Sequence, residues 1–198
     1  MFIYIILFML NNSIVLGSGS PRRKQLLNEL GFQLEIVSLD IDESYPTDLP
    51  SSFVALFVAE KKMEALNILK TDNQLLLTAD TTVIFADTIL GKPIDENNAK
   101  EMLQLLSNQT HTVNTGVVIS FEGKTEKISC FTEVQFNLLS PNQIDFYIAN
   151  FHPFDKAGSY GIQDWFGLVG IKSINGSYTN VVGLPTDECF KAIQRIVG

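Results

Sequence analysis

Short apolar runs alternate along the chain with longer stretches whose apolar residues recur at helical spacing. Runs bounded by turn residues predict strands, and apolar residues three and four positions apart predict helices. Strands are expected at 13–16, 32–37, 75–85, 111–121, 125–137 and 169–174, with a short return strand at 89–90. Helices are expected at 21–30, 52–69, 95–106, from Pro141 onward, and at 185–197.

Turn and cap residues separate these elements. Gly31 suits the left-handed position after the first helix, and Ser140 suits the N-cap before Pro141. Gly123 lies in the polar break "EGK" of a long hairpin. A glycine-rich loop, "FDKAGSYGIQDWFG", precedes the last strand. Alternating helices and strands with at least one hairpin predict an α/β fold, a mixed twisted sheet flanked by helices, in two lobes.

Composition narrows the classes of partner. Of 198 residues, 45% are hydrophobic and 18% charged, which is enough to bury a substantial core. The net charge of −8 disfavours nucleic acid and anionic membranes, so a polyanion would have to meet a local cluster of cations. Cys130 and Cys189 lack metal-type spacing and are expected as reduced thiols, which indicates the cytoplasm.

The first ten residues, "MFIYIILFML", resemble the core of a signal peptide. They lack a basic start and a cleavage pattern, and they are too short to span a bilayer. We therefore expect residues 1–12 to be an apolar extension and residues 13–198 to form a single domain. Met9, or a position near it, is the expected natural start.

The segment "LGSGSPRRKQLL" concentrates cations at a helix start. Ser20 can cap the helix, Pro21 suits its first position, and the glycines allow backbone amides to turn toward a ligand. Cations at this end of a helix are unfavourable, so Arg22 and Arg23 suggest a polyphosphate ligand. The alternative is an ordinary capped helix with solvated arginines. The segment matches neither the dinucleotide fingerprint nor the P-loop.

Seven motifs in order, "SGSPRRKQLLNELG", "DIDE", "TADTTV", "GKP", "LSNQTHTVNTG", "KAGSYGIQ" and "NVVGLP", resemble the Maf family of nucleoside triphosphate pyrophosphatases. The resemblance covers the chain from Ile14 onward and is greatest to the branch that hydrolyses dTTP and UTP. It implies a fold similar to that of ITPases, with two lobes around a central cleft, a homodimer, and house-cleaning of nucleotides.

The resemblance implies two acidic residues for the chemistry. Asp80 closes the apolar run "LLLTAD", and is therefore expected at the C-terminal edge of a strand. It matches the family's proton acceptor, and Glu43 in "DIDE" matches its partner in binding a metal. Two carboxylates suit Mg²⁺ or Mn²⁺. His111 is expected to have a structural role, and His152 belongs to no motif.

The implied reaction is attack by a metal-activated water on the α-phosphorus, which releases pyrophosphate and a nucleoside monophosphate.

Lys61 is expected to point away from Lys62, because neighbours on a helix do not share a face. By themselves Lys62 and Lys92 would be read as solvated surface lysines. By resemblance, the residues that bind the phosphates are Ser18, Arg22, Arg23, Lys62 and Lys92.

The resemblance also implies that Arg22, Thr81 and Gln163 select the base. An amide such as that of Gln163 can pair with the imide edge of uracil or thymine. The family pattern follows this glutamine with glycine, whereas "DWFG" follows it here. Trp165 or Phe166 could stack on a base or fill a hydrophobic gap.

Two other classes of function stay open at this point. One is a non-catalytic module that binds a nucleotide with the same cations. The other is an interaction protein in cell division or septation, which the family name suggests and no residue encodes.

Overall fold

The computed structural model describes residues 13–70 and 73–198. The predicted extension, residues 1–12, and the start near Met9 lie outside the described residues. Within the described part, no helix combines the length and the apolar character that a membrane crossing requires.

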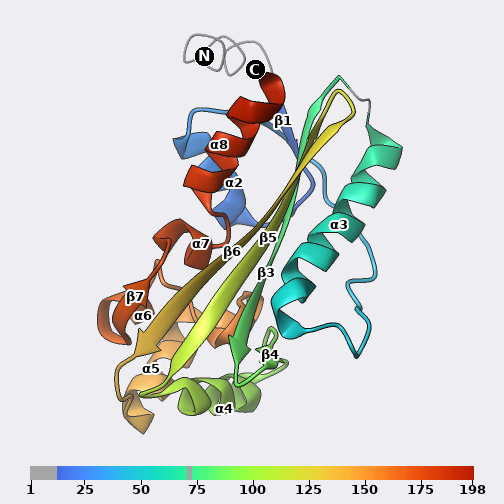
Figure 1. Cartoon of the computed structure of the whole chain (residues 1–198). Coiled ribbons are helices and arrows are strands. Elements are labelled where there is room, and N and C mark those ends of the chain that lie inside the picture. Colours follow the sequence, from blue (N-terminus) through green and yellow to red (C-terminus); the bar gives the residue numbers. More distant parts are fainter. Residues whose placement is uncertain (1–12, 71–72) are drawn as a thin grey trace. The chain divides into compact units, whose positions relative to one another are not determined.

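The described strands form a seven-stranded mixed sheet in the order β2-β1-β3-β5-β6-β7, with β4 paired to β3 (Figure 1). Strand β1 is parallel to β2 and β3, whereas the pairs β3–β4 and β6–β7 are antiparallel. The predicted α/β class is confirmed. The strands are β1 (Ser13–Leu16), β2 (Gln33–Ile36), β3 (Leu75–Phe85), β4 (Thr88–Leu90), β5 (Thr110–Phe121), β6 (Lys124–Phe136) and β7 (Ile171–Asn175).

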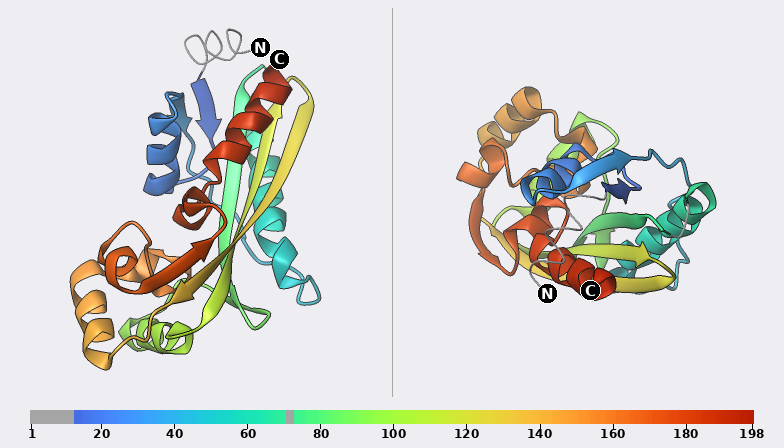
Figure 2. Two further views of the ribbon diagram at one scale, coloured as in Figure 1. Left: turned by 60° about the vertical axis from the view of Figure 1, so that its left-hand side comes forward. Right: turned by 90° about the horizontal axis from the view of Figure 1, so that it is seen from above.

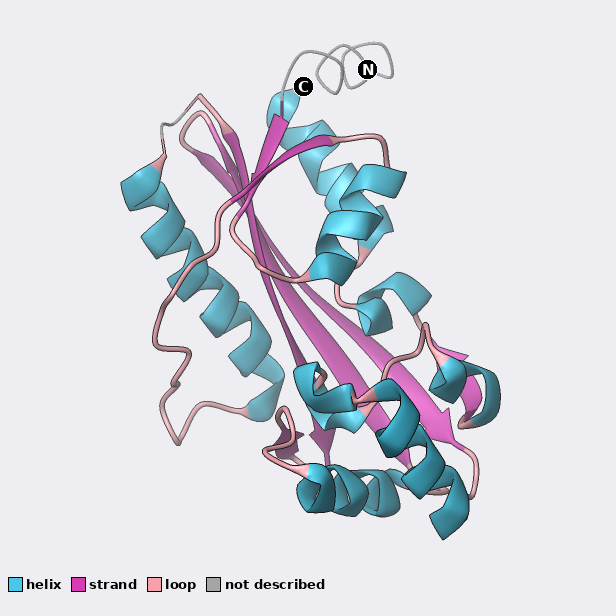
Figure 3. Cartoon of the chain, turned by 180° about the vertical axis from the view of Figure 1, so that it is seen from behind, coloured by secondary structure: helices cyan, strands magenta, loops and turns pink. Residues whose placement is uncertain are grey.

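Helices flank the strands, as Figure 3 shows in cyan. Local signals start several of them: the Ser20 side chain accepts the Arg23 N–H, and Ser140 forms a capping box with Gln143. The helices are α2 (Pro21–Glu29), α3 (Ser51–Leu69), α4 (Glu96–Leu106), α5 (Pro141–Phe151), α6 (Trp165–Val169), α7 (Tyr178–Val182) and α8 (Thr186–Val197), with 3₁₀ turns η1 (Pro153–Asp155) and η2 (Ala157–Ser159).

Two short helices and one strand boundary differ from the prediction. Helices α6 and α7 fall in segments that were expected to be irregular, and Val169 ends α6 instead of starting a strand. Strand β7 therefore begins at Ile171. Five residues are too few for a periodic pattern to be visible, so contacts with the rest of the fold decide their conformation.

The described residues form two compact units, each of which includes part of β3, β5 and β6. Of the described residues, the first unit comprises 13–70, 73–80, 115–130 and 183–198. Within it, α3 lies on one face of the strands, and α2 and α8 lie on the other (Figures 1 and 2). The cluster beneath α3 consists of Val15, Ala59, Met63, Leu66, Leu76 and Val118.

Helix α3 is seated directly on the backbone of β5. A Cβ atom added at Gly116 would lie 2.3 Å from the backbone N and Cα atoms of Leu56 on α3, so a side chain there would displace the helix. On β3, the Thr78 hydroxyl donates to the Ala59 carbonyl of α3 over 2.7 Å. These two contacts fix the height of α3 above the sheet and its position along it.

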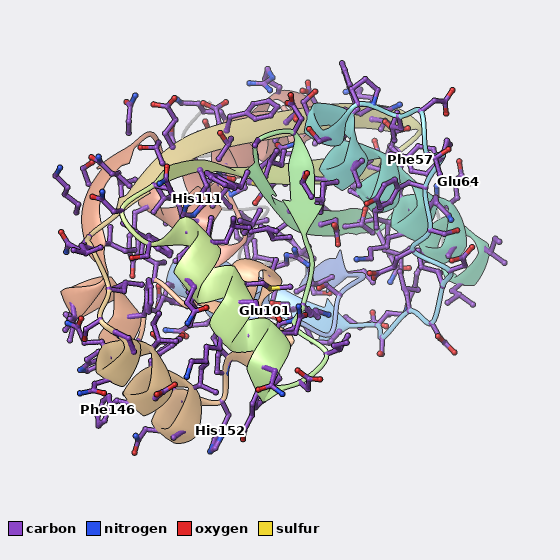
Figure 4. All side chains as sticks on the ribbon, turned by 90° about the horizontal axis from the view of Figure 1, so that it is seen from below. Phe57, Glu64, Glu101, His111, Phe146 and His152 are labelled. Carbon is purple, nitrogen blue, oxygen red and sulfur yellow. The ribbon has the colours of Figure 1, made fainter. Side chains whose placement is uncertain are left out.

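The second unit comprises residues 81–114 and 131–182. Figure 4 shows α4, which carries Glu101, and α5, which carries Phe146. The core of this unit combines aliphatic residues with a cluster of aromatic rings. The rings of Phe136 and Phe166 lie 4.8 Å apart, and those of Tyr147 and Phe166 lie 5.0 Å apart. Phe166 therefore fills the core, and Trp165 packs against α5 with its ring 5.1 Å from that of Phe146.

His111 lies inside this aromatic core, in agreement with its expected structural role. Its Nε2 lies 2.8 Å from the Tyr160 hydroxyl, and its ring meets the edges of Phe136 and Tyr160. The buried Nδ1 has no hydrogen-bond partner among the described residues. Burial disfavours the charged imidazolium and lowers the pKa of His111 to about 4.

This burial predicts a pH dependence of stability. Between the ordinary histidine pKa of 6.5 and the folded value of about 4, the unfolded chain binds a proton that the folded chain does not. The free energy of unfolding should therefore fall as the pH falls through this window, by up to about 3 kcal/mol. Urea titrations of the wild type and of His111→Gln at pH 7.5 and pH 4.5 check this. An equal loss in both proteins would contradict it.

Candidate active site

The Gly/Ser turn between β1 and α2 is held by an internal arginine. Arg23 is only 8% exposed; its Nε donates to the Gly183 carbonyl at 2.9 Å, and its Nη1 donates to the Ser18 hydroxyl at 3.1 Å. The Ser18 hydroxyl also accepts the Ser20 N–H at 3.2 Å. Two predicted phosphate-binding residues, Ser18 and Arg23, are thus brought together, whereas Arg22 beside them is half-buried.

Arg23 also belongs to the electrostatic surroundings of the predicted acids. Burial lowers the pKa of its guanidinium, and the negative charges of Asp80 and Glu43 act in the opposite direction. An arginine stays charged under such conditions. The turn therefore carries a buried positive charge within reach of both carboxylates.

Lys62 connects the two predicted metal ligands. Its Nζ, on the buried side of α3, lies 2.8 Å from Glu43 Oε1 and 2.8 Å from Asp80 Oδ1. The Lys62 and Asp80 side chains are 10% and 18% exposed, whereas that of Glu43 is 55% exposed. A buried ammonium needs such partners, because desolvation without them would cost several kcal/mol. Two carboxylate oxygens consequently converge on one cation.

Lys61 binds the same loop from outside. Its Nζ donates to the Ser44 carbonyl at 2.9 Å and lies 3.8 Å from Asp42 Oδ2. As predicted, it points away from the pair that Lys62 contacts. The two successive lysines together hold the loop that carries Glu43 against α3.

The prediction that Asp80 ends a strand is wrong. Strand β3 continues to Phe85, so Asp80 lies in its middle. Its parallel neighbour β1 pairs with β3 only as far as Leu77, and Gly17 then donates its N–H to the Leu77 carbonyl. The strand that ends near Asp80 is therefore β1, not β3. Because β3 extends beyond the end of β1, Asp80 lies beside the Gly/Ser turn that follows β1.

The remaining predicted residues belong to the second unit. Thr81 follows Asp80 in β3 and is half-buried, whereas Lys92 and Gln163 are exposed in loops. The Gly158 N–H donates to the Gly91 carbonyl at 3.0 Å, which ties the loop of Lys92 to the glycine-rich segment. That these side chains meet the same molecule as Arg22 and Asp80 stays a prediction.

Several positioning residues were not found from the sequence. The Gly183 carbonyl fixes Arg23 although it lies 160 positions away, and the motif "NVVGLP" was the only signal that could have drawn attention to it. Tyr147 and Asp164, which contact the segment around Gln163, belong to no motif.

The two carboxylates of Glu43 and Asp80 fit a divalent cation whose remaining ligands are not protein side chains. No group of three or more His, Cys, Asp or Glu side chains among the described residues is placed to hold a metal. The Glu43 and Asp80 oxygens already surround one cationic atom, Lys62 Nζ. Mg²⁺ commonly takes one or two carboxylates and fills its shell with water and phosphate oxygens.

Cys130 and Cys189 are free thiols, and burial raises the pKa of both.

Comparison with known proteins places this geometry in context. The family described as "Maf-like protein" matches residues 13–196. The dTTP/UTP pyrophosphatase of Flavobacterium psychrophilum is 47% identical, covering 91% of this chain and 92% of its own. That of Porphyromonas gingivalis is 48% identical, also covering 91% and 92%. A solved structure, the nucleoside-triphosphatase or dITP/XTP pyrophosphatase of Mycobacterium abscessus, matches with TM-score 0.40 and 15% identity, covering 63% of this chain and 72% of that one.

The buried ion pair predicts a strong energetic coupling between Lys62 and Asp80. In a double-mutant cycle, Lys62→Met should destabilise the wild type by about 2 kcal/mol more than it destabilises Asp80→Asn. In the wild type the change leaves the largely buried Asp80 carboxylate without its cation and near the Glu43 carboxylate. The measurement is urea unfolding at pH 7.5. The longer and more exposed pair Lys61–Asp42 is the matched control and should give less than about 0.5 kcal/mol. Equal coupling energies for the Lys62–Asp80 and Lys61–Asp42 pairs would contradict the prediction.

Proposed function

Because the chain belongs to the Maf family, we propose that it is a nucleoside triphosphate pyrophosphatase that hydrolyses dTTP and UTP to the monophosphate and pyrophosphate. Relatives of 47% and 48% identity carry the name dTTP/UTP pyrophosphatase. The observation that carries the proposal is the convergence of Glu43 and Asp80 on Lys62 beside the Gly/Ser turn. Modified pyrimidine nucleotides, a homodimer and a cytoplasmic location are proposed with it.

Asp80 acts as the proton acceptor. Its carboxylate takes a proton from the water that attacks the α-phosphorus, and pyrophosphate leaves. The position of Asp80 in the middle of β3, with its side chain held by Lys62, supports this role, because a general base must be oriented before it can act. No covalent intermediate is part of the proposal.

The cations bind and orient the polyphosphate. Lys62 and Arg23 are buried, so their charges act in a medium that screens them less than water does. Arg22 and Lys92 supplement them, and the Ser18 hydroxyl, fixed by Arg23, lines the turn. Charge placed in advance where the phosphoryl group becomes more negative lowers the barrier of the transfer.

Glu43 and Asp80 would hold Mg²⁺ or Mn²⁺. A bound divalent cation neutralises phosphate charge and lowers the pKa of a coordinated water. Lys62 keeps the two carboxylates close together and limits their repulsion, and the greater exposure of Glu43 leaves it accessible to an incoming ion. Arg22, Thr81 and Gln163 select the base, with the exposed Gln163 amide offering both a donor and an acceptor.

A panel of dTTP, UTP, dCTP, dATP and dGTP, assayed for released pyrophosphate and for the monophosphate, tests the activity. dTTP and UTP should be the preferred substrates. Asp80→Asn should lower kcat roughly 1,000-fold, as expected for loss of a general base, with an unchanged circular dichroism spectrum. Asp145→Asn, the same change at an exposed pair with Lys100, is the control and should retain activity. Tight binding of dTTP without turnover would instead favour the non-catalytic module.

The metal proposal predicts that a chelator abolishes turnover and that added Mg²⁺ restores it. In Glu43→Gln, one of the two carboxylates is lost, so the half-saturating Mg²⁺ concentration should rise at least about tenfold. Mg²⁺ should also raise the Tm of the wild type more than that of Glu43→Gln, since an ion that binds only the folded state stabilises it. Full activity in the chelator would remove the metal from the mechanism.

A further inference from the structure

The segment that carries Gln163 is held at both ends by one tyrosine. Tyr147 lies on α5, and its side chain is fully buried. Its hydroxyl accepts the Gly161 N–H at 3.0 Å and donates to Asp164 Oδ2 at 3.0 Å. A phenolic hydroxyl can accept and donate at the same time, so the two bonds are compatible. Gly161 and Asp164 flank Ile162 and Gln163, and we call residues 161–164 the clamped loop.

Helix α6 closes the clamped loop from the other side. Asp164 Oδ1 accepts the Phe166 N–H at 3.0 Å, so one carboxylate both caps α6 and bonds to Tyr147. A Cβ atom added at Gly167 would lie 1.8 Å from the Ile162 carbonyl oxygen, which means that the α6 backbone rests on the loop. Ile162 is buried and Gln163 is exposed. The backbone is therefore constrained while one side chain projects into solvent.

Packing fixes the hydroxyl independently of its hydrogen bonds. The Tyr147 ring is stacked with those of Phe151, at 5.4 Å, and Trp165, at 6.1 Å. Burial raises the pKa of Tyr147, so the hydroxyl stays protonated and able to donate. Replacing tyrosine with phenylalanine would preserve the ring contacts and remove only the bonds to the clamped loop.

We propose that Tyr147 is a positioning residue for base selection, whose hydroxyl holds the clamped loop in the conformation that presents Gln163 to a pyrimidine base. The inference rests on the proposed function, in which Gln163 reads the base. An amide on a constrained backbone loses little freedom when it pairs with the imide edge, whereas one on a loose loop pairs with any base poorly. The proposed chemical residues Glu43, Lys62 and Asp80 belong to the first unit, and the clamp belongs to the second.

The experiment compares kcat/KM for dTTP with that for dATP in full-length variants. Tyr147→Phe should lower the dTTP preference about tenfold, the effect of losing one well-oriented polar contact. The loss should lie mainly in KM, with kcat within about twofold of the wild type, because Asp80 is unchanged. Asp164→Asn, whose amide can donate to the Tyr147 oxygen, should retain most of the preference.

Two controls separate positioning from general destabilisation. Tyr160→Phe removes another buried hydroxyl of the same unit, bonded to His111 rather than to the loop, and should leave the preference within about twofold. In a Gln163→Ala background, Tyr147→Phe should cause no further loss of preference, because the hydroxyl acts through Gln163. Hydrogen–deuterium exchange should speed up at residues 161–164 in Tyr147→Phe and not in Tyr160→Phe.

The outcomes distinguish this inference from the function on which it rests. If Gln163→Ala changes the preference and Tyr147→Phe does not, the inference is overturned and the proposed function stands. Unchanged exchange in Tyr147→Phe also overturns it, since the clamp would then not hold the loop. If the wild type releases no pyrophosphate from dTTP or UTP, or if Gln163→Ala keeps the full preference, the proposed role of Gln163 fails first and the inference fails with it.

Discussion

The direct seating of α3 on the sheet is the constraint on which the candidate site depends. Because Gly116 has no side chain, the helix backbone reaches the strand, and the Thr78–Ala59 hydrogen bond fixes its position along β3. Lys62, one turn further along α3, is thereby buried beside Asp80. A lysine in that position cannot be left without partners, so the loop with Glu43 closes over it. The position of α3 on the sheet thus determines where the charge of Lys62 lies.

The Gly/Ser turn applies the same electrostatic principle with a different cation. Arg23 is buried, its Nη1 donates to the Ser18 hydroxyl, and its Nε donates to the distant Gly183 carbonyl. Its charge adds to that of Lys62, and the carboxylates of Asp80 and Glu43 act against the cost of burying both. A site that is already hydrogen-bonded before substrate arrives needs little reorganisation when negative charge develops in it. The proposed pyrophosphatase activity depends physically on this preorganisation.

In the second unit, aromatic packing rather than buried charge holds the key side chains in position. His111 stays neutral within the rings of Phe136 and Tyr160, and Tyr147 is oriented by stacked neighbours. In "DWFG", which follows Gln163 where the family pattern has glycine, the two aromatic residues serve this packing: Phe166 fills the core and Trp165 stacks on Tyr147. The residues that depart from the family pattern therefore support the clamped loop.

The sequence by itself determined the elements whose signals are local. Periodic apolar residues and the caps Ser20 and Ser140 place the longer helices and strands within one or two residues. The motifs also indicated Glu43, Lys62 and Asp80 as functional residues. Only the tertiary structure decided that Lys62 bridges the two acids, that Arg23 bonds across 160 positions, that Asp80 lies in the middle of its strand, and that α6 is helical. Periodicity and capping act over a few residues, whereas these features depend on desolvation and steric contact between segments that meet only when the chain folds.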